Sequence, residues 1–245
     1  MGARPELGAG SAWRTGLAAA GYAVVHDVAL DGDNAALRKL GADLGAASVH
    51  GIRPGDRNAE DHGINRVEAM DQPRLDPAGR VILSTSADDF PLHTDDTFTA
   101  DPVRYVLMHC WQPDPGGGGI STVAHVRDIL AGLCAATLER LKVPDFPSPF
   151  GLAPVLFPAP GGAPGELAIR FNHRDFIGYG ERFGPRITAS QEQALDEVLA
   201  LADRHATTFM LAAGDCVVVD NHRVLHGRTA FSPGSPRLIK RLRIR

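Results

Sequence analysis

The sequence lacks the features that mark secreted, membrane and nucleic-acid-binding proteins. Its 245 residues include three cysteines and no Cys-x-x-Cys pair, which excludes a disulfide framework. No apolar run approaches the roughly 18 residues of a transmembrane helix, and the N-terminus shows no secretory core. Twenty-five basic against 29 acidic residues give a net charge of −4, without the basic excess of a nucleic-acid binder. We therefore predict a soluble cytoplasmic protein that binds neither nucleic acid nor membrane.

Glycine and proline are abundant instead, with 27 and 18 residues, which favours short elements over a long-helix bundle. The length suits one domain, 1–245. Its first 50 residues form an N-terminal region that packs on the core, with helices at 12–21 and 34–45 around a strand at 22–25. The absence of regular strand–helix alternation favours an α+β or mainly-β fold over a doubly wound sheet.

The rest of the chain is dominated by strand patterns. We predict strands at 103–111, 120–124, 167–171, 209–211, 215–220 and 238–244, and helices at 129–141 and 191–204. Ser190 and Gln193 have the spacing of a capping box for the last helix. The polar segment 51–80 and the proline- and glycine-rich segment 144–166 are long loops, which are often functional or mobile. Whether either covers an active site is open at this stage.

The triplet His93-Thr94-Asp95 is the first candidate for chemistry. On a strand, residues i and i+2 point to one face, so an imidazole and a carboxylate would meet there. Together with a distant histidine they would form the 2-His-1-carboxylate triad of non-haem Fe(II) oxygenases. His226, which follows the strand pattern at 215–220, is the candidate third ligand. A His-x-Asp triplet is common by chance, and a surface turn is the alternative interpretation.

The C-terminal segment RLIKRLRIR alternates basic and apolar residues. On a strand, Arg237, Ile239, Arg241 and Arg243 would share one face. A guanidinium binds a carboxylate through two parallel hydrogen bonds, so an inward-facing arginine beside a metal suits a 2-oxo acid. A basic strand that faces water is the alternative.

Taken in order, four features resemble the taurine dioxygenase-like (TauD/TfdA) family, within the clavaminate synthase-like group. They are His93-x-Asp95, GGGGISTVA at 116–124, DNHRVLHGRTAF at 220–231, and Arg237. The resemblance runs from about Leu83 to the C-terminus, and its wording is nearest to the γ-butyrobetaine hydroxylase-like branch. It implies a mainly-β fold with flanking helices around a double-stranded β-helix, or jelly-roll, core. It also implies a non-haem Fe(II)- and 2-oxoglutarate-dependent dioxygenase that consumes O₂.

The resemblance implies roles for single residues as well. His93, Asp95 and His226 would bind iron. Arg237 would bind the distal carboxylate of 2-oxoglutarate with help from the hydroxyl of Thr122, for which neighbouring Ser121 is the alternative. Arg241 would lie near the cosubstrate or the substrate, and Asn172 and Arg174 would contact the substrate, with a polar loop as the alternative for the last two. Apart from the resemblance, the position of Asp89 and Asp88 shortly before the triplet would suit an ammonium group, with a solvated acidic loop as the alternative.

The substrate class follows from composition and from these side chains. Aromatic residues make up only 6% of the chain, and few lie near the site segments, which disfavours an aromatic cage for a trimethylammonium group. We predict hydroxylation of an unactivated C–H bond in a small amino-acid-like substrate, with release of succinate and CO₂. Four alternatives stay open: desaturation, cyclisation or epimerisation by the same cofactors; a γ-butyrobetaine-like hydroxylase; a jelly-roll binding module without activity; and a zinc hydrolase on the same triad.

Overall fold

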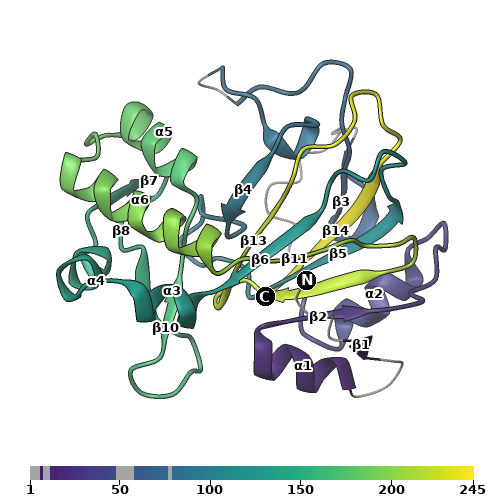
Figure 1. Ribbon diagram of the computed structural model, residues 1–245, viewed down its shortest axis with the longest axis horizontal. Coiled ribbons are helices and arrows are strands. Elements are labelled where there is room, and N and C mark those ends of the chain that lie inside the picture. Colours follow the sequence, from purple (N-terminus) through teal and green to yellow (C-terminus); the bar gives the residue numbers. More distant parts are fainter. Residues whose placement is uncertain (1–5, 8–11, 48–57, 77–78) are drawn as a thin grey trace.

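The computed structural model describes residues 6–7, 12–47, 58–76 and 79–245, and two facing β-sheets form its centre (Figure 1). The larger sheet has the order β1 (Glu6–Leu7), β2 (Tyr22–Val25), β12 (Cys216–Asp220), β5 (Tyr105–Gln112), β14 (Leu238–Ile244) and β3 (Ile64–Val67). The smaller sheet has the order β11 (Thr207–Phe209), β6 (Ser121–His125), β13 (Val224–Arg228) and β4 (Phe90–His93). Neighbouring strands are mostly antiparallel and distant in sequence, which confirms the predicted jelly-roll core.

Helices cover the outer faces of both sheets (Figure 1). The larger sheet is covered by α1 (Ala12–Ala20) and α2 (Ala35–Ala42), and the smaller by α3 (Val126–Gly132), α4 (Ala135–Lys142), α5 (His173–Phe183) and α6 (Ala189–Arg204). Shorter elements are η1 (Asp61–Gly63), η2 (Leu83–Thr85), and the pairs β7 (Phe146–Ser148) with β8 (Gly151–Ala153) and β9 (Leu156–Pro158) with β10 (Leu167–Ile169). None of the described helices combines the length and apolarity needed to cross a membrane.

Strand alternation decides which side chains enter the space between the sheets. On β13, Leu225 packs under α3–α6, whereas Val224 joins the cluster between the sheets. His226 has the same parity as Val224 and therefore points inward. On β14, Ile239 lies between the sheets and Leu242 packs under α1 and α2, which confirms the predicted alternation of the C-terminal strand.

The predicted strands all overlap strands of the structure, but some helix boundaries differ. The single helix expected at 129–141 is two helices, because Leu133 is extended and the sulfur of Cys134 caps α4. The capping box of α6 lies two residues earlier than predicted, at Thr188 and Gln191. Both differences arise from local capping, which shifts ends without changing the buried face.

Several elements were missed because they lie in segments expected to be loops, among them β7, β8 and β9 within 144–166. Helix α5 follows β10 directly, and Asn172 caps it by accepting a hydrogen bond from the backbone N–H of Asp175. Strand β3 lies inside the predicted loop 51–80, where pairing with β14 stabilises it. Residues 48–57 and 77–78 of the predicted N-terminal and loop regions lie outside the described residues.

Candidate active site

Strands β4 and β13 bring the two predicted histidine ligands together. His93 and His226 are direct partners in the antiparallel register, and their ring centres are 4.5 Å apart. Asp95 follows β4, and its Oδ1 lies 3.5 Å from His93 Nε2 and 3.7 Å from His226 Nε2. All three side chains are buried, and one ligand atom from each lies within 4.8 Å of the others. Among the described residues, these three form the cluster that could hold a metal ion.

The imidazole of His93 is oriented for such a role. Its Nδ1 lies 2.9 Å from the carbonyl oxygen of Pro91, so Nδ1 carries the proton and donates it to this bond. The opposite nitrogen, Nε2, is buried and has no hydrogen-bond partner within the described chain. A hydrogen bond to one ring nitrogen fixes the tautomer and leaves the other nitrogen free to ligate a metal.

Asn221 holds the backbone of Asp95, a role that the sequence reasoning missed. Its side-chain oxygen accepts a 2.7 Å hydrogen bond from the Asp95 backbone N–H, and its Nδ2 donates to the Asp95 carbonyl at 3.1 Å. Nδ2 also donates to the Val103 carbonyl, and the side chain is fully buried. Asn221 belongs to the DNHRVLHGR segment, which was the available signal.

Electrostatics favour the metal-binding protonation states of Asp95 and His226. Burial alone would raise the pKa of Asp95, but Arg241 and the two histidines hold that pKa well below its usual value. The Arg241 Nη1 lies 3.0 Å from Asp95 Oδ2. Burial lowers the pKa of His226 and so favours its neutral form. An ionised carboxylate and neutral imidazoles are the forms that bind a divalent ion.

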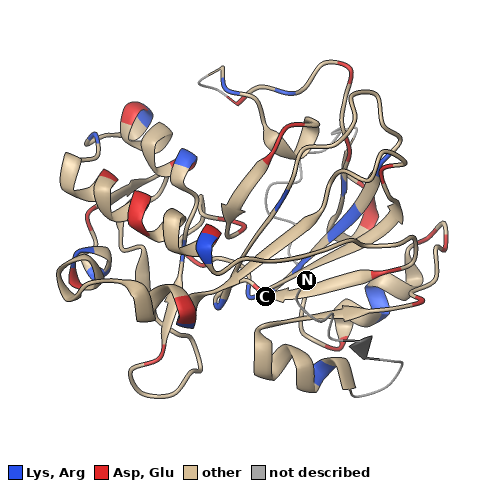
Figure 2. Ribbon diagram, in the orientation of Figure 1, with Lys and Arg blue, Asp and Glu red and all other residues tan. Residues whose placement is uncertain are grey.

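Two cavities meet at this cluster. The larger, of about 480 Å³, is lined by residues within 58–76, 80–85 and 90–98, by the start of α5 and by the end of β14, and it reaches His93 and Asp95. The smaller, of about 50 Å³, lies between the sheets and reaches both histidines. Arg241 lines both, and Figure 2 shows basic residues along β14, the strand that carries it.

Arg237 dominates the smaller cavity. Its side chain is buried, its Nη1 has no hydrogen-bond partner within the described chain, and burial lowers its pKa. The guanidinium lies 5.0 Å from the centre of the Phe231 ring, and no acidic residue is among those that line this cavity. A buried cation without a counter-ion is costly, so an anionic ligand that enters here would be strongly stabilised.

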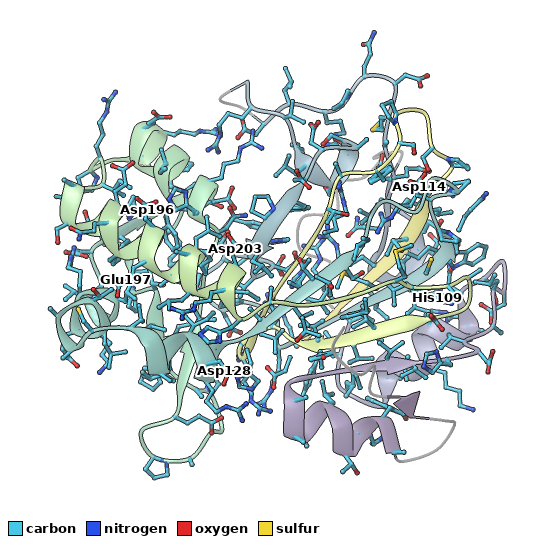
Figure 3. All side chains as sticks on the ribbon, viewed as in Figure 1. His109, Asp114, Asp128, Asp196, Glu197 and Asp203 are labelled. Carbon is cyan, nitrogen blue, oxygen red and sulfur yellow. The ribbon has the colours of Figure 1, made fainter. Side chains whose placement is uncertain are left out.

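The glycine-rich loop gives Arg237 its space. Gly119 has a φ of +66°, and a Cβ at this position would collide with the Arg237 guanidinium. The loop is anchored by Asp114, whose Oδ2 accepts hydrogen bonds from the Gly118 backbone at 2.9 Å and from Ser232 Oγ at 3.2 Å (Figure 3). The run of glycines therefore serves close approach by an arginine from the neighbouring loop.

The strand register corrects the prediction for Thr122. Val123 is the partner of His226 and shares its face, so Ser121 shares that face too. Ser121 lines the smaller cavity, whereas Thr122 is the partner of Gly227 and points to the opposite side. The one-residue alternative therefore fits the structure, since a shift of one residue on a strand exchanges the two faces.

The predicted substrate contacts divide into two groups. Asn172, Arg174 and Arg241 line the larger cavity. Asp89 does not: its Oδ1 accepts a 2.6 Å hydrogen bond from the Ala230 backbone and so secures the chain after β13. This placement corrects the prediction that Asp89 meets the substrate. One of the acidic residues that line the cavity is Asp175, which the sequence reasoning did not single out.

Two segments, 51–80 and 144–166, were considered as covers of an active site. Described residues of the first line the larger cavity, and the second does not line it. Arg80 donates a 2.7 Å hydrogen bond to the Arg174 carbonyl, pairs with Asp76 at 2.7 Å, and packs against Gly178 so closely that a Cβ there would collide with it. This clasp joins the loop before η2 to α5. Residues 144–166, all described, contribute no lining residue to either cavity.

The family model described as "Taurine catabolism dioxygenase TauD, TfdA family" matches residues 6–243. The chain belongs to this family. Among curated TauD/TfdA relatives, the L-asparagine oxygenase of Streptomyces coelicolor is 28% identical over 61% of this chain and 45% of its own length. Clavaminate synthase 2 of Streptomyces clavuligerus is 30% identical over 66% of this chain and 51% of its own length. The chain thus spans about half the length of these curated relatives.

Solved structures agree with the TauD/TfdA fold. A crystal structure of asparagine oxygenase superposes with a TM-score of 0.73 at 21% identity, covering 96% of this chain and 80% of that one. The non-haem iron oxygenase OrfP, in a complex with iron and α-ketoglutaric acid, superposes with a TM-score of 0.65 at 17% identity, covering 91% and 74%. At these identities the likeness establishes the fold.

Proposed function

We propose that this chain is a non-haem Fe(II)- and 2-oxoglutarate-dependent dioxygenase that hydroxylates an unactivated C–H bond of a small amino-acid-like substrate and releases succinate and CO₂. The observation that carries the proposal is the buried guanidinium of Arg237, whose Nη1 has no partner among the described residues and which lines the same cavity as His93 and His226. A metal triad alone suits many reactions. A triad next to an anion site in a separate cavity suits a metal with a dicarboxylate cosubstrate.

The residues present fit both groups. Two imidazole nitrogens and one carboxylate form the donor set of the Fe(II) facial triad, and the free Nε2 of His93 is oriented toward it. Arg237 and Ser121 would hold the distal carboxylate of 2-oxoglutarate at the far end of the smaller cavity. Bound iron and 2-oxoglutarate would supply the reactivity toward O₂ and the C–H bond.

Other residues of this chain would orient the metal ligands and the substrate and limit the access of water. Asn221 fixes the backbone of Asp95, and Pro91 fixes the His93 tautomer, so both ligands are oriented before a metal arrives. The loop clasped by Arg80 closes one side of the larger cavity and limits the access of water. Asn172 and Arg174 would then orient the substrate, and Arg241, between the cavities, would adjust to substrate or cosubstrate.

An amino-acid-like substrate is supported by the cavity and by the relatives. The aromatic residues that line the larger cavity are Phe90 and Phe98, and Phe90 already stacks on His93, so the aromatic cage expected for a γ-butyrobetaine-like cation is missing from the described lining. Curated and structural relatives are named for asparagine, and OrfP structures hold hydroxylated arginine. Desaturation, cyclisation and epimerisation would use the same site and would be separated by product analysis.

The state of the cysteines bears on where the protein is located. Cys110, Cys134 and Cys216 are unpaired thiols, as predicted. We propose a cytoplasmic location on this ground, because a reducing compartment keeps thiols in that state.

A zinc hydrolase or a binding module without activity would leave Arg237 without a role.

The direct test is anaerobic absorption spectroscopy with Fe(II) and 2-oxoglutarate. We expect the wild type to show the visible charge-transfer band of the chelated pair. Arg237→Ala is expected to raise the apparent Kd for 2-oxoglutarate by about 100-fold, because it removes a desolvated charge pair. Arg237→Lys, which keeps the charge but not the fork, should fall between the two. Absence of the band from folded, iron-loaded wild type would remove the cosubstrate assignment.

Ser121 and Thr122 provide a matched pair for the same assay. Ser121→Ala is expected to raise the apparent Kd for 2-oxoglutarate by about tenfold, because a hydroxyl bond to a charged group is lost. Thr122→Ala should change it by less than about twofold, since its hydroxyl points to the opposite face of β6. A larger effect from Thr122→Ala than from Ser121→Ala would contradict the register.

A further inference from the structure

Charge pairing in the larger cavity is incomplete at one position. Four acidic side chains line it, and three of them have arginine partners from this chain. These pairs are Asp76 with Arg80, Asp95 with Arg241, and Asp96 with Arg243. The fourth, Asp175, forms no ion pair with any residue that the structure describes, although arginines line the same cavity.

Hydroxyl groups hold Asp175 in place of a cation. Its Oδ2 accepts hydrogen bonds from Thr97 Oγ1 at 2.9 Å and from Tyr179 OH at 3.2 Å. Its Oδ1 has no hydrogen bond within the described chain and is not among the buried atoms that lack a partner, so it is open to the cavity. One oxygen is thus anchored and the other is presented at a defined position.

The neighbouring residue offers the opposite charge. Arg174 also lines the cavity, and its guanidinium has no hydrogen bond or ion pair with the described residues; only its backbone carbonyl is engaged, by Arg80. Asp175 and Arg174 follow each other in the first turn of α5. One free acceptor and one free cation on the same wall form a site for a molecule that carries both charges.

We propose that Asp175 Oδ1 binds an ammonium group of the substrate while Arg174 binds a carboxylate, so that the enzyme selects amino acids with a free amine. This inference rests on the proposed function and names its substrate class. Burial raises the pKa of Asp175, so its ionised form gains most from a bound cation. A substrate whose amine is replaced by a neutral amide or acyl group would leave the Asp175 carboxylate without a cationic partner, because none of the described residues forms an ion pair with it.

The test is substrate binding to the Fe(II)- and 2-oxoglutarate-loaded enzyme without O₂. The twenty common L-amino acids are screened by the shift of the absorption band, and Kd values are measured by calorimetry. For the best binder, the analogue with hydrogen in place of each amine is compared. The variants are Asp175→Asn, which keeps an oxygen for Thr97 and Tyr179, and Asp89→Asn, a matched carboxylate outside the cavity.

We expect Asp175→Asn to raise the Kd of the best amino acid by about 100-fold and Asp89→Asn to change it by less than about twofold. The deaminated analogue should bind weakly, and equally, to wild type and Asp175→Asn. If Asp175→Asn does not fold, Asp175→Glu and Arg174→Gln carry the test. Asp175→Glu should retain selectivity for the amine, and Arg174→Gln should weaken the amino acid but not the amine that lacks its carboxylate.

Equal binding of the amino acid to wild type and Asp175→Asn would overturn the inference. So would tight binding of the deaminated analogue to the wild type. A wild type that shows the Fe(II) 2-oxoglutarate band but binds none of the amino acids would also overturn it, while the proposed cofactor chemistry stands. Absence of that band would instead remove the proposed function.

Discussion

Replacing His226 by alanine is expected to reduce Fe(II)-dependent turnover of 2-oxoglutarate by more than about 100-fold. Mutation of residues that only hydrogen-bond to metal ligands typically costs about 10–100-fold, and loss of a ligand itself should cost more. The physical reason is the geometry of the cluster. His226 comes from β13, whereas His93 and Asp95 come from the end of β4, so its loss leaves ligands from one side only. Two neighbouring ligands hold a divalent ion far more weakly than three on one face.

The measurement is iron content after anaerobic loading and desalting, followed by succinate formation with O₂. His222→Gln is the matched control. His222 lies four residues earlier in the same segment and is buried, but its Nε2 lies 3.1 Å from the Pro102 carbonyl, away from the cluster. The control should bind iron as the wild type does. Full iron loading and turnover in His226→Ala would contradict the assignment of this ligand.

Replacing Arg243 by alanine is expected to lower the free energy of unfolding by about 3–5 kcal/mol, a large share of the roughly 5–15 kcal/mol of a typical domain. Arg243 donates to Asp96 Oδ1 and, at 2.7 Å, to Asn65 Oδ1, and all three side chains are buried. Removing the arginine leaves the Asp96 carboxylate in the interior without its counter-charge. The cost of that uncompensated charge is the source of the large effect.

Urea unfolding followed by circular dichroism measures this change, with Arg245→Ala as the control on the same segment. Arg245 pairs with Asp101 at 3.2 Å, but both side chains are well exposed, 37% and 78%. An exposed pair contributes about 0–1 kcal/mol, so the control should be close to the wild type. Equal decreases in the free energy of unfolding of Arg243→Ala and Arg245→Ala would show that the buried ion pair stabilises the protein no more than the exposed one.

The iron-site candidates could be found in the sequence because their signal is local. His93 and Asp95 are two residues apart, and strand alternation predicts that they share a face. In the structure Asp95 lies in the turn after β4, and Asn221 holds its backbone beside His93. His226 and Arg237 were found through motifs rather than through geometry, since their closeness depends on the register of β13 with β4 and on the loop that Asp114 anchors. The spacing of residues along the chain does not specify that register.

Ser121 and Asp175 illustrate what the sequence could not decide. Ser121 and Thr122 are adjacent hydroxyl residues, and only pairing of β6 with β13 determines which of them faces inward. Asp89 and Asp175 were both acidic residues near site segments. The chain uses Asp89 to secure a neighbouring backbone, while the first turn of α5, missed as a helix, carries Asp175 into the cavity.

Composition and strand patterns indicated a mainly-β fold and the pairing of His93 with Asp95, because those signals are short-range. The jelly-roll core, His226 and Arg237 were predicted from the resemblance to the TauD/TfdA family. The partners of those residues were decided by tertiary contacts. Asn221 against Asp95, Arg241 against the same carboxylate, and Gly119 beneath Arg237 join elements far apart in the chain. Long-range packing selects such contacts by complementary shape and charge, and the three-dimensional fold therefore decides which polar residues meet the substrate and which support the chain.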